Sequence, residues 1–318
     1  MKTSTFLCFF LLSFLFLPFP GDPAHGGPEK PSGEGVRDPI LAGSWYPAGA
    51  KELSAQIGAF LARAEGKALR GDLKAIIVPH AGITYSGQVA AYAYRLLEGR
   101  GFERVVLVGP SHRLPFRGSS VNLQSAYRTP LGEVPVDREF AGELMKACPD
   151  LTWVPRAHEL EHCLEIQIPF LQSVLGQFRI VPILMGEQDP GSCSRLARAL
   201  VQGLWGSGGT LLLASTDLSH FHSAERARQL DLEFIRQIRN FDPEGLIRSL
   251  RKGDCEACGG GPAAAVMLAA AHLGADRARI LSYAHSGDVT GDNTRVVGYL
   301  SAALLKGERE STGDKTGD

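Results

Sequence analysis

Two histidines and one cysteine, far apart in the chain, have the side chains that bind transition metals. His80 follows the apolar run AIIVP (75–79), His112 follows RVVLVGPS (104–111), and Cys258 precedes three glycines. Imidazole nitrogen and thiolate sulfur suit zinc, copper and iron. A single buried histidine is more often a hydrogen-bonded structural residue, and that interpretation stays open for each histidine taken alone. The pair and the cysteine together indicate a metal site.

Cys258 also lies in a distinctive local setting. The glycine run 259–261 and Pro262 lead into a helical pattern over 263–273, and proline suits the first turn of a helix. A helix N-terminus favours a thiolate, so we expect a lowered pKa for Cys258, as a metal ligand or a nucleophile. Three alternatives remain open: a structural cysteine, a disulfide with Cys255, and anion binding by the glycine N–H groups.

Acidic residues accompany further histidines. Asp217 and His220 lie three residues apart, and an acid near a histidine can orient the ring for proton transfer. Glu161, His162 and Glu165 form a second cluster at the start of a predicted helix, where acids often only complement the helix dipole. We predict His220 and Asp217 as catalytic residues. The predicted substrate-binding residues are Tyr85, Ser111, Glu161, His162, Gly259 and Gly260.

Alternating strand and helix patterns must position these residues. Continuous apolar runs predict strands at 75–79, 104–109, 178–185, 210–215, 278–284 and 295–304. Helical patterns cover 88–97, 164–175, 191–203 and 263–273. The alternation predicts an α/β single domain with a mostly parallel or mixed central sheet and helices on both faces. His80, His112 and Asp217 each follow a strand, and ligand sites of such sheets gather at that edge.

Composition limits the classes of function and of compartment. The chain has 318 residues, 44% of them apolar, and a formal net charge of -1. No long Lys/Arg run stands out, so a nucleic-acid partner has no electrostatic support. Residues 1–26 hold one lysine, a short apolar run and a proline-rich exit, which predicts a signal peptide or membrane anchor. Export or anchoring through this segment is therefore expected, with a cytoplasmic location as the alternative. We expect a linker at 27–38, one domain at 39–305 and a disordered tail at 306–318.

Six motifs occur in the order seen in one protein family. They are Ala42-Gly43-Ser44-Trp45-Tyr46, Pro79-His80-Ala81-Gly82, Gly109-Pro110-Ser111-His112, Glu161-His162-x-x-Glu165, Ser215-x-Asp217-x-x-His220 and Cys258-Gly259. The chain thereby resembles Memo-like proteins, called AmmeMemoRadiSam system protein B in prokaryotes. The resemblance implies a fold similar to class III extradiol dioxygenases and functional partners among AMMECR-type and radical SAM proteins. It places the metal ligands on His80, His112 and Cys258.

The resemblance also implies iron or copper at the site, with zinc as a further option, and redox chemistry on a small substrate. The alternative is a non-catalytic protein that recognises an anionic, phosphorylated peptide or metabolite in the same pocket. The chain departs from the family at Cys163, where serine is common, and at Gly260, where a larger residue is common. The dioxygenases complete their iron site with a carboxylate, so the thiol of Cys258 does not predict ring cleavage.

Overall fold

The computed structural model describes residues 35–65, 69–206 and 208–307. The predicted signal peptide or anchor at 1–26 lies outside the described residues, as does most of the predicted linker and tail. Among the described residues, no helix combines the length and the apolar character needed to cross a membrane.

Within the described residues, nine strands form a mixed sheet in the order β10-β12-β2-β9-β3-β8-β4-β7, with β11 paired to β12. The strands of this sheet are β2 (Asp72–Val78), β3 (Arg104–Pro110), β4 (Ser119–Val121), β7 (Leu151–Thr152), β8 (Arg179–Met185), β9 (Thr210–Ser215), β10 (His220–His222), β11 (Arg277–His285) and β12 (Val296–Lys306). Its central strands β2, β9, β3 and β8 are parallel, and β12 runs antiparallel to β2. A second sheet contains β1 (Val36–Arg37), β5 (Ala126–Thr129) and β6 (Gly132–Pro135).

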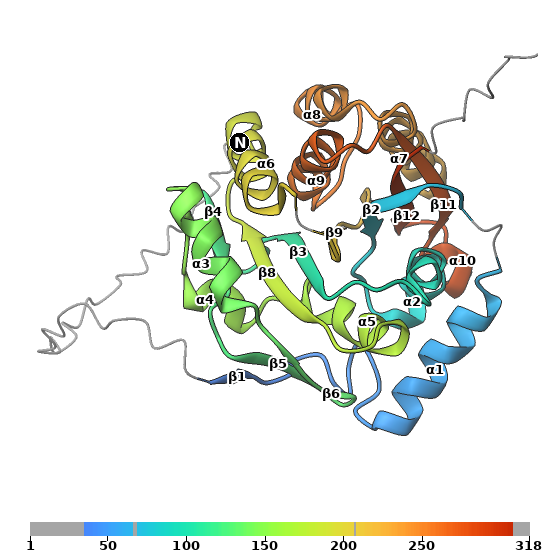
Figure 1. Ribbon diagram of the computed structural model, residues 1–318. Coiled ribbons are helices and arrows are strands. Elements are labelled where there is room, and N and C mark those ends of the chain that lie inside the picture. Colours follow the sequence, from blue (N-terminus) through green and yellow to red (C-terminus); the bar gives the residue numbers. More distant parts are fainter. Residues whose placement is uncertain (1–34, 66–68, 207, 308–318) are drawn as a thin grey trace, which may run out of the picture. The chain divides into compact units, whose positions relative to one another are not determined.

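Helices cover both faces of the large sheet (Figure 1). On one face lie α3 (Arg138–Ala147), α6 (Pro190–Leu204), α7 (Ala224–Arg239), α8 (Pro243–Lys252) and α9 (Gly260–His272). On the other lie α1 (Ala50–Arg63), α2 (Ile83–Tyr94) with a 3-10 turn Arg95–Leu97, α5 (Ile168–Val174) after the 3-10 turn Glu165–Gln167, and the small sheet. The short helices are α4 (Pro155–Glu159) and α10 (Gly287–Thr290).

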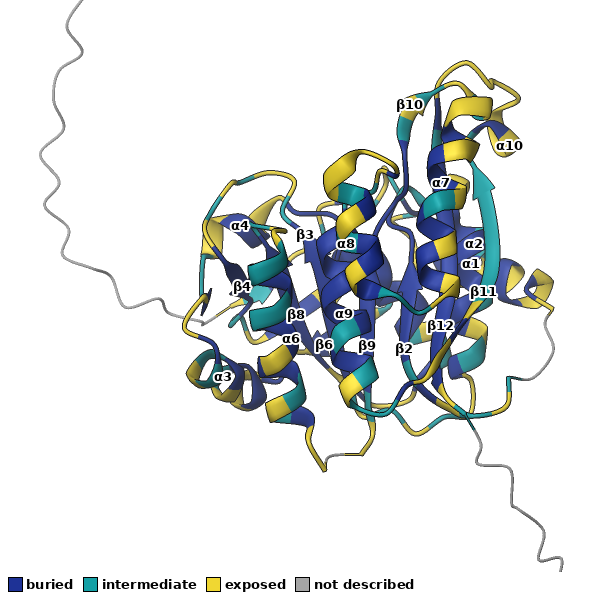
Figure 2. Cartoon of the chain, turned by 90° about the horizontal axis from the view of Figure 1, so that it is seen from above, coloured by how far each residue is buried: buried dark blue, intermediate teal, exposed yellow. Residues whose placement is uncertain are grey.

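Alternate residues of each strand enter opposite cores. Ala75 and Ile77 of β2 pack under α9 and its neighbours, whereas Ile76 and Val78 pack under α1, α2 and α5. Figure 2 shows the result: the central strands are mostly buried, apart from their N-terminal ends, and the helices expose their outer sides. The predicted α/β domain with a mixed sheet and helices on both faces is therefore confirmed.

Two predicted boundaries are wrong, and a tertiary contact explains each. The linker was expected to extend to residue 38, but Arg37 belongs to β1 and its buried guanidinium pairs with Glu165 at 2.6 Å. The tail was expected from residue 306, but Lys306 closes β12 opposite Asp72 of β2. Both segments are polar in sequence, and their pairing with distant residues keeps them in the folded domain.

The helix after β2 begins earlier than predicted. It was expected at 88–97, whereas α2 begins at Ile83. Glycine disfavours helices, but Gly87 lies inside α2 because it allows close packing. A Cβ on Gly87 would come 2.7 Å from Cε2 of Phe60. The requirement for this glycine comes from the contact between α1 and α2.

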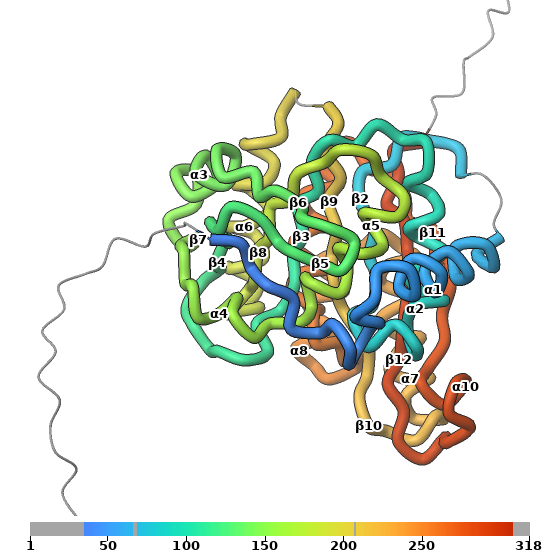
Figure 3. The backbone as a smooth tube through the Cα atoms, turned by 90° about the horizontal axis from the view of Figure 1, so that it is seen from below, coloured from blue at the N-terminus to red at the C-terminus, as the bar shows by residue number. Residues whose placement is uncertain are grey.

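A projection at one end of the sheet joins distant parts of the chain. β10, α10 and the adjoining ends of β11 and β12 lie side by side there (Figure 3). His222 pairs with Val296, and Ala224 donates its N–H to the carbonyl oxygen of Asn293. This projection carries His220 to the carboxyl edge of the central strands.

Candidate metal centre

Three neighbouring parallel strands bring the predicted ligands together. His80 follows β2 and His112 follows β3, while β9 lies between these two strands. α9 packs against all three, so Cys258, which precedes it, reaches the same edge. Nε2 of His80 lies 3.1 Å from Sγ of Cys258. The ligand atoms of His80, His112 and Cys258 all lie within 4.8 Å of one another, which confirms the predicted cluster.

The ring of His112 is oriented by a buried carboxylate. Its Nδ1 lies 2.9 Å from Oε1 of Glu161, and its main-chain N–H donates to Oε2 at 2.6 Å. Burial raises the pKa of Glu161, but His112 and His162 outweigh it and lower that pKa to about 2. An ionised carboxylate can only accept, so Nδ1 of His112 carries a proton and donates it to Glu161.

Glu161 therefore has a different role from the predicted one. It was expected to bind substrate, but its Oε1 also accepts from the main-chain N–H groups of His162 and Cys163 at 3.0 and 3.1 Å. Its side chain is nearly fully buried, and both oxygens are occupied by these bonds. Glu161 positions His112, as a second-layer carboxylate does in many metal sites.

His162 forms a wall of the centre. Its ring stacks on that of His112 with centroids 4.4 Å apart, and lies 5.5 Å from that of His80. Trp45 packs against its other side at 4.7 Å. Burial lowers the pKa of His162 to about 3, and His80 adds to this effect, so the ring is neutral near pH 7. The rings of His162 and Trp45 thus pack beside the rings of His80 and His112.

The expected lowering of the Cys258 pKa is wrong. Burial, and next the charge of Asp217, raise the pKa of this thiol well above its ordinary value, because they outweigh the start of α9. The thiol therefore keeps its proton, in reach of Nε2 of His80. Cys255 and Cys258 are both free, so the disulfide alternative is not realised.

The glycine turn before α9 uses its N–H groups internally. Gly259 donates to Oγ1 of Thr216 at 3.0 Å, and Gly261 donates to Oε1 of Gln188 at 2.8 Å. The N–H of Gly260 points to the carbonyl oxygen of Ala257 at 3.4 Å. A Cβ on Gly259 would lie 2.3 Å from the carbonyl oxygen of Ser215, so glycine is needed for close approach to β9. The turn offers no free donors to an anion.

Asp217 and His220 are near the centre but are not joined to each other. Oδ1 of Asp217 accepts from the main-chain N–H groups of His80 at 2.7 Å and Ala81 at 3.3 Å. Burial raises the pKa of Asp217 to about 6. No hydrogen bond links Asp217 to His220 in the described part of the chain. Asp217 thus holds the segment of His80, and His220 must be oriented by β10.

A cavity of about 450 Å³ lies beside the thiol of Cys258. Its lining includes His220, Gln188, Leu250 and Gly260. A Cβ on Gly260 would meet Cδ1 of Leu250 at 2.5 Å, so a larger residue there would have to displace this side chain. The cavity is lined by both Cys258 and His220, so these two residues border the same space.

The remaining predicted residues differ in setting. Tyr85 is 44% exposed on the first turn of α2, where it is free to meet a ligand. Ser111 donates its hydroxyl to the carbonyl oxygen of Leu114 at 2.7 Å and so stabilises the loop after β3. The substrate roles predicted for both residues stay predictions.

Two residues behind His80 were missed by the sequence analysis. Oγ of Ser215 lies 2.9 Å from Nδ1 of His80, and Nε2 of Gln167 lies 2.8 Å from the same oxygen. Ser215 ends β9, so the rule that located His80 and His112 at strand ends could have found it. Gln167 lies in a short 3-10 turn, and only the tertiary structure brings it to the site.

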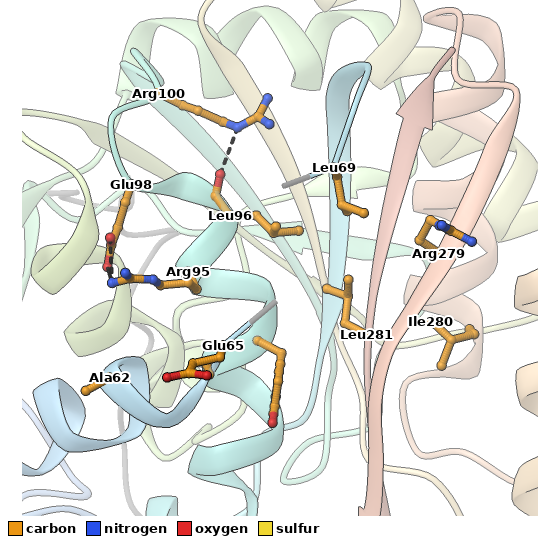
Figure 4. A pocket seen from close by; sticks show the side chains of 12 residues that line it. Ala62, Glu65, Leu69, Arg95, Leu96, Glu98, Arg100, Arg279, Ile280 and Leu281 are labelled. Carbon is orange, nitrogen blue, oxygen red and sulfur yellow. Dashed lines mark hydrogen bonds and ion pairs between the residues drawn. The ribbon is translucent and has the colours of Figure 1, made fainter. Parts of the chain in front are cut away.

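A hollow larger than the cavity beside Cys258 lies away from this chemistry. It measures about 620 Å³ and is formed by α1, the end of α2 and β11 (Figure 4). Its polar groups are largely engaged: Arg95 pairs with Glu98, and Nε of Arg100 donates to the carbonyl oxygen of Leu96. Neither histidine nor cysteine lines it. Size alone therefore does not identify the functional site.

Comparisons with known proteins identify the family. The family described as "Memo-like protein" matches residues 37–303. The MEMO1 family protein MK0963 of Methanopyrus kandleri is 36% identical over 284 residues, covering 85% of this chain and 99% of its own. A MEMO1 family protein of Ignicoccus hospitalis is 38% identical over 277 residues, covering 84% and 97%.

Among solved structures, the uncharacterized protein JW3007 from Escherichia coli K12 matches with a TM-score of 0.47 and 14% identity, over 73% of this chain and 100% of its own. The extent of the family match and the identity to the two MEMO1 family proteins are far higher. On these grounds the chain belongs to the Memo-like protein family.

Proposed function

We propose that this protein is a metal-dependent redox enzyme that acts on a small substrate. The observation that carries the proposal is the cluster of two imidazole nitrogens and one thiol within 4.8 Å at the carboxyl edge of the sheet. Three protein ligands leave a position open for a substrate, as in catalytic metal sites. Imidazole with thiolate suits copper and iron, and zinc fits the same donors without redox chemistry. We favour Fe(II) or copper.

When bound, such a metal supplies Lewis acidity and one-electron chemistry. The chain's own groups complete the site. Glu161 holds the ring of His112, and Asp217 holds the main chain of His80. His162 stacks on the ring of His112, and Trp45 packs against His162. His220 lines the cavity beside Cys258, where it can accept or donate a proton of a substrate held there.

The alternative function, recognition of a phosphorylated peptide or metabolite, has less support. It relied on free N–H groups in the glycine turn and on nearby histidines, and the N–H groups already have acceptors within the protein. An anion would have to displace Gln188 from the start of α9. We therefore rank a metal centre above anion recognition.

Metal analysis tests the proposal. Protein purified under reducing, oxygen-free conditions is titrated with Fe(II), Cu(I) and Zn(II), in the wild type and in Cys258→Ser. One equivalent of metal should bind to the wild type, and Cys258→Ser should bind it at least 10-fold more weakly because the thiolate donor is lost. Cys193→Ser is the matched control, since Cys193 is buried near α9 but outside the cluster.

Oxygen consumption by the iron- or copper-loaded protein, with the zinc-loaded protein as the blank, then tests for redox activity. Absence of bound metal in the wild type, or equal affinity in both cysteine variants, would contradict the metal centre. Tight binding of inorganic phosphate by the metal-free protein would instead favour the alternative function.

A further inference from the structure

We propose that Ser215 is a positioning residue that fixes the tautomer of His80, so that Nε2 keeps a free lone pair for a metal. The inference rests on the proposed function for its purpose, but the tautomer itself follows from the hydrogen bonds around one hydroxyl group. His112 is set by a carboxylate, whereas His80 has only a neutral side chain behind it. A serine hydroxyl can fix the tautomer of a histidine only if the hydroxyl donates its own proton to a third group.

The proton of the Ser215 hydroxyl is committed to a carbonyl group. Oγ of Ser215 lies 2.7 Å from the carbonyl oxygen of Cys163, which can only accept. The hydroxyl has one proton, so the same oxygen must accept in its contact with Nδ1 of His80 at 2.9 Å. The proton of the imidazole therefore lies on Nδ1.

Gln167 strengthens this arrangement from the other side. Its Nε2 lies 3.0 Å from the carbonyl oxygen of Pro79 and 2.8 Å from Oγ of Ser215, while Oε1 accepts from the hydroxyl of Tyr94 at 2.5 Å. The contact with the carbonyl fixes which end of the amide carries nitrogen. Ser215 thus accepts from Gln167 and His80 and donates once, which uses its full bonding capacity.

The whole network is shielded from solvent. Ser215 and Tyr94 are fully buried, and Gln167 is 1% exposed. Water cannot replace a lost bond easily, so the alternative tautomer of His80 would place two acceptors, Nδ1 and Oγ of Ser215, against each other, or would leave the carbonyl of Cys163 poorly satisfied if the hydroxyl turned to Nδ1. With the proton on Nδ1, the free lone pair of Nε2 faces Sγ of Cys258 at 3.1 Å.

Nitrogen NMR of metal-free, reduced protein with labelled histidine reads the tautomer directly. In the wild type His80 should carry its proton on Nδ1, and in Ser215→Ala a large part should shift to Nε2. Ser120→Ala is a matched control: Ser120 is equally buried, and its Oγ lies 3.0 Å from Nε2 of His158. This control should leave the His80 signals unchanged.

Metal titration gives the second readout. Ser215→Ala should weaken metal binding by roughly 10- to 100-fold, as loss of an outer partner of a ligand histidine does. Ser120→Ala should leave the affinity unchanged. Ser215→Thr keeps a hydroxyl and should restore the Nδ1 proton if it folds.

The outcomes separate the tautomer from the metal proposal. A wild-type His80 with its proton on Nε2 would overturn the inference even if no variant folds, and so would an unchanged tautomer in folded Ser215→Ala. A wild type that has the expected tautomer but binds no metal would instead refute the proposed function and leave Ser215 as the residue that orients the ring.

Discussion

His80 and His158 are both buried histidines with a serine beside one ring nitrogen, and they differ in the partner of the other nitrogen. His158 lies between Oγ of Ser120 at 3.0 Å and the hydroxyl of Tyr127 at 3.5 Å, so both ring nitrogens have side-chain partners. His80 has a serine at Nδ1 as well, but its Nε2 faces the thiol of Cys258.

Burial lowers the pKa of His158 to about 3 and that of His80 well below its ordinary value. A lowered pKa therefore does not distinguish a ligand histidine from a structural one. The distinguishing feature is a nitrogen left free toward a second metal-binding atom.

The largest effect should come from removing one histidine of each kind. His80→Ala should weaken metal binding by more than about 100-fold, since loss of an outer partner alone costs 10- to 100-fold. His158→Ala should destabilise the fold yet keep the affinity within about threefold. Competition with a chromophoric chelator measures both. A similar loss of affinity in the two variants would remove the distinction.

Glu161→Gln should have the next largest effect. The amide keeps the shape of the side chain but loses the charge that holds the Nδ1 proton of His112, so metal affinity should fall by roughly 10- to 100-fold. Glu187→Gln is the control, because Glu187 also accepts a main-chain N–H, from Gly118, on a loop outside the cluster. Equal affinities in the two variants would show that Glu161 does not support the centre.

Metal binding should depend on pH through the thiol. The pKa of Cys258 is raised, so near neutral pH a metal must displace its proton. Affinity should rise by about tenfold per pH unit between pH 7 and 8, with release of about one proton. Calorimetry in buffers of different ionisation enthalpy counts that proton. Binding without proton release would mean that the sulfur is not a ligand.

The smallest effect concerns stability in acid. His158 is neutral when folded, with a pKa of about 3, and takes up a proton on unfolding below its ordinary value of 6.5. The free energy of unfolding should therefore fall as the pH drops from 6.5 toward 3, by up to about 1.4 kcal/mol per pH unit from this group. Denaturant titrations of His158→Gln should show a shallower fall. Parallel curves for variant and wild type would contradict this account.

The strand pattern predicted the cluster but not its electrostatics. His80 and His112 could be placed together because apolar runs mark parallel strands and their carboxyl ends meet at one edge. Glycine and proline mark the start of α9 just after Cys258, but the resemblance to Memo-like proteins was needed to join this cysteine to the two histidines. The raised thiol pKa could not be predicted, since it depends on burial by distant segments.

The roles of residues that act through tertiary contacts also could not be predicted from the sequence. The sequence predicted that Glu161 binds substrate, yet its carboxylate oxygens accept hydrogen bonds from His112 and from N–H groups of the loop that contains Glu161. Arg37 reads as part of a polar linker, and Ser215 as the last residue of a strand. Each gains its role from a contact more than 45 residues away in the chain.

The guanidinium of Arg37, in β1, connects this strand to the segment 158–165 that contains Glu161. It donates to the carboxylate of Glu165 at 2.6 Å, to the carbonyl oxygen of Glu161 at 2.7 Å and to that of His158 at 2.8 Å. Cleavage that removed Arg37 would leave the buried side chain of Glu165 without the guanidinium that pairs with it, and would loosen Glu161, the residue that holds His112. The latest tolerable N-terminal processing point therefore lies upstream of Arg37.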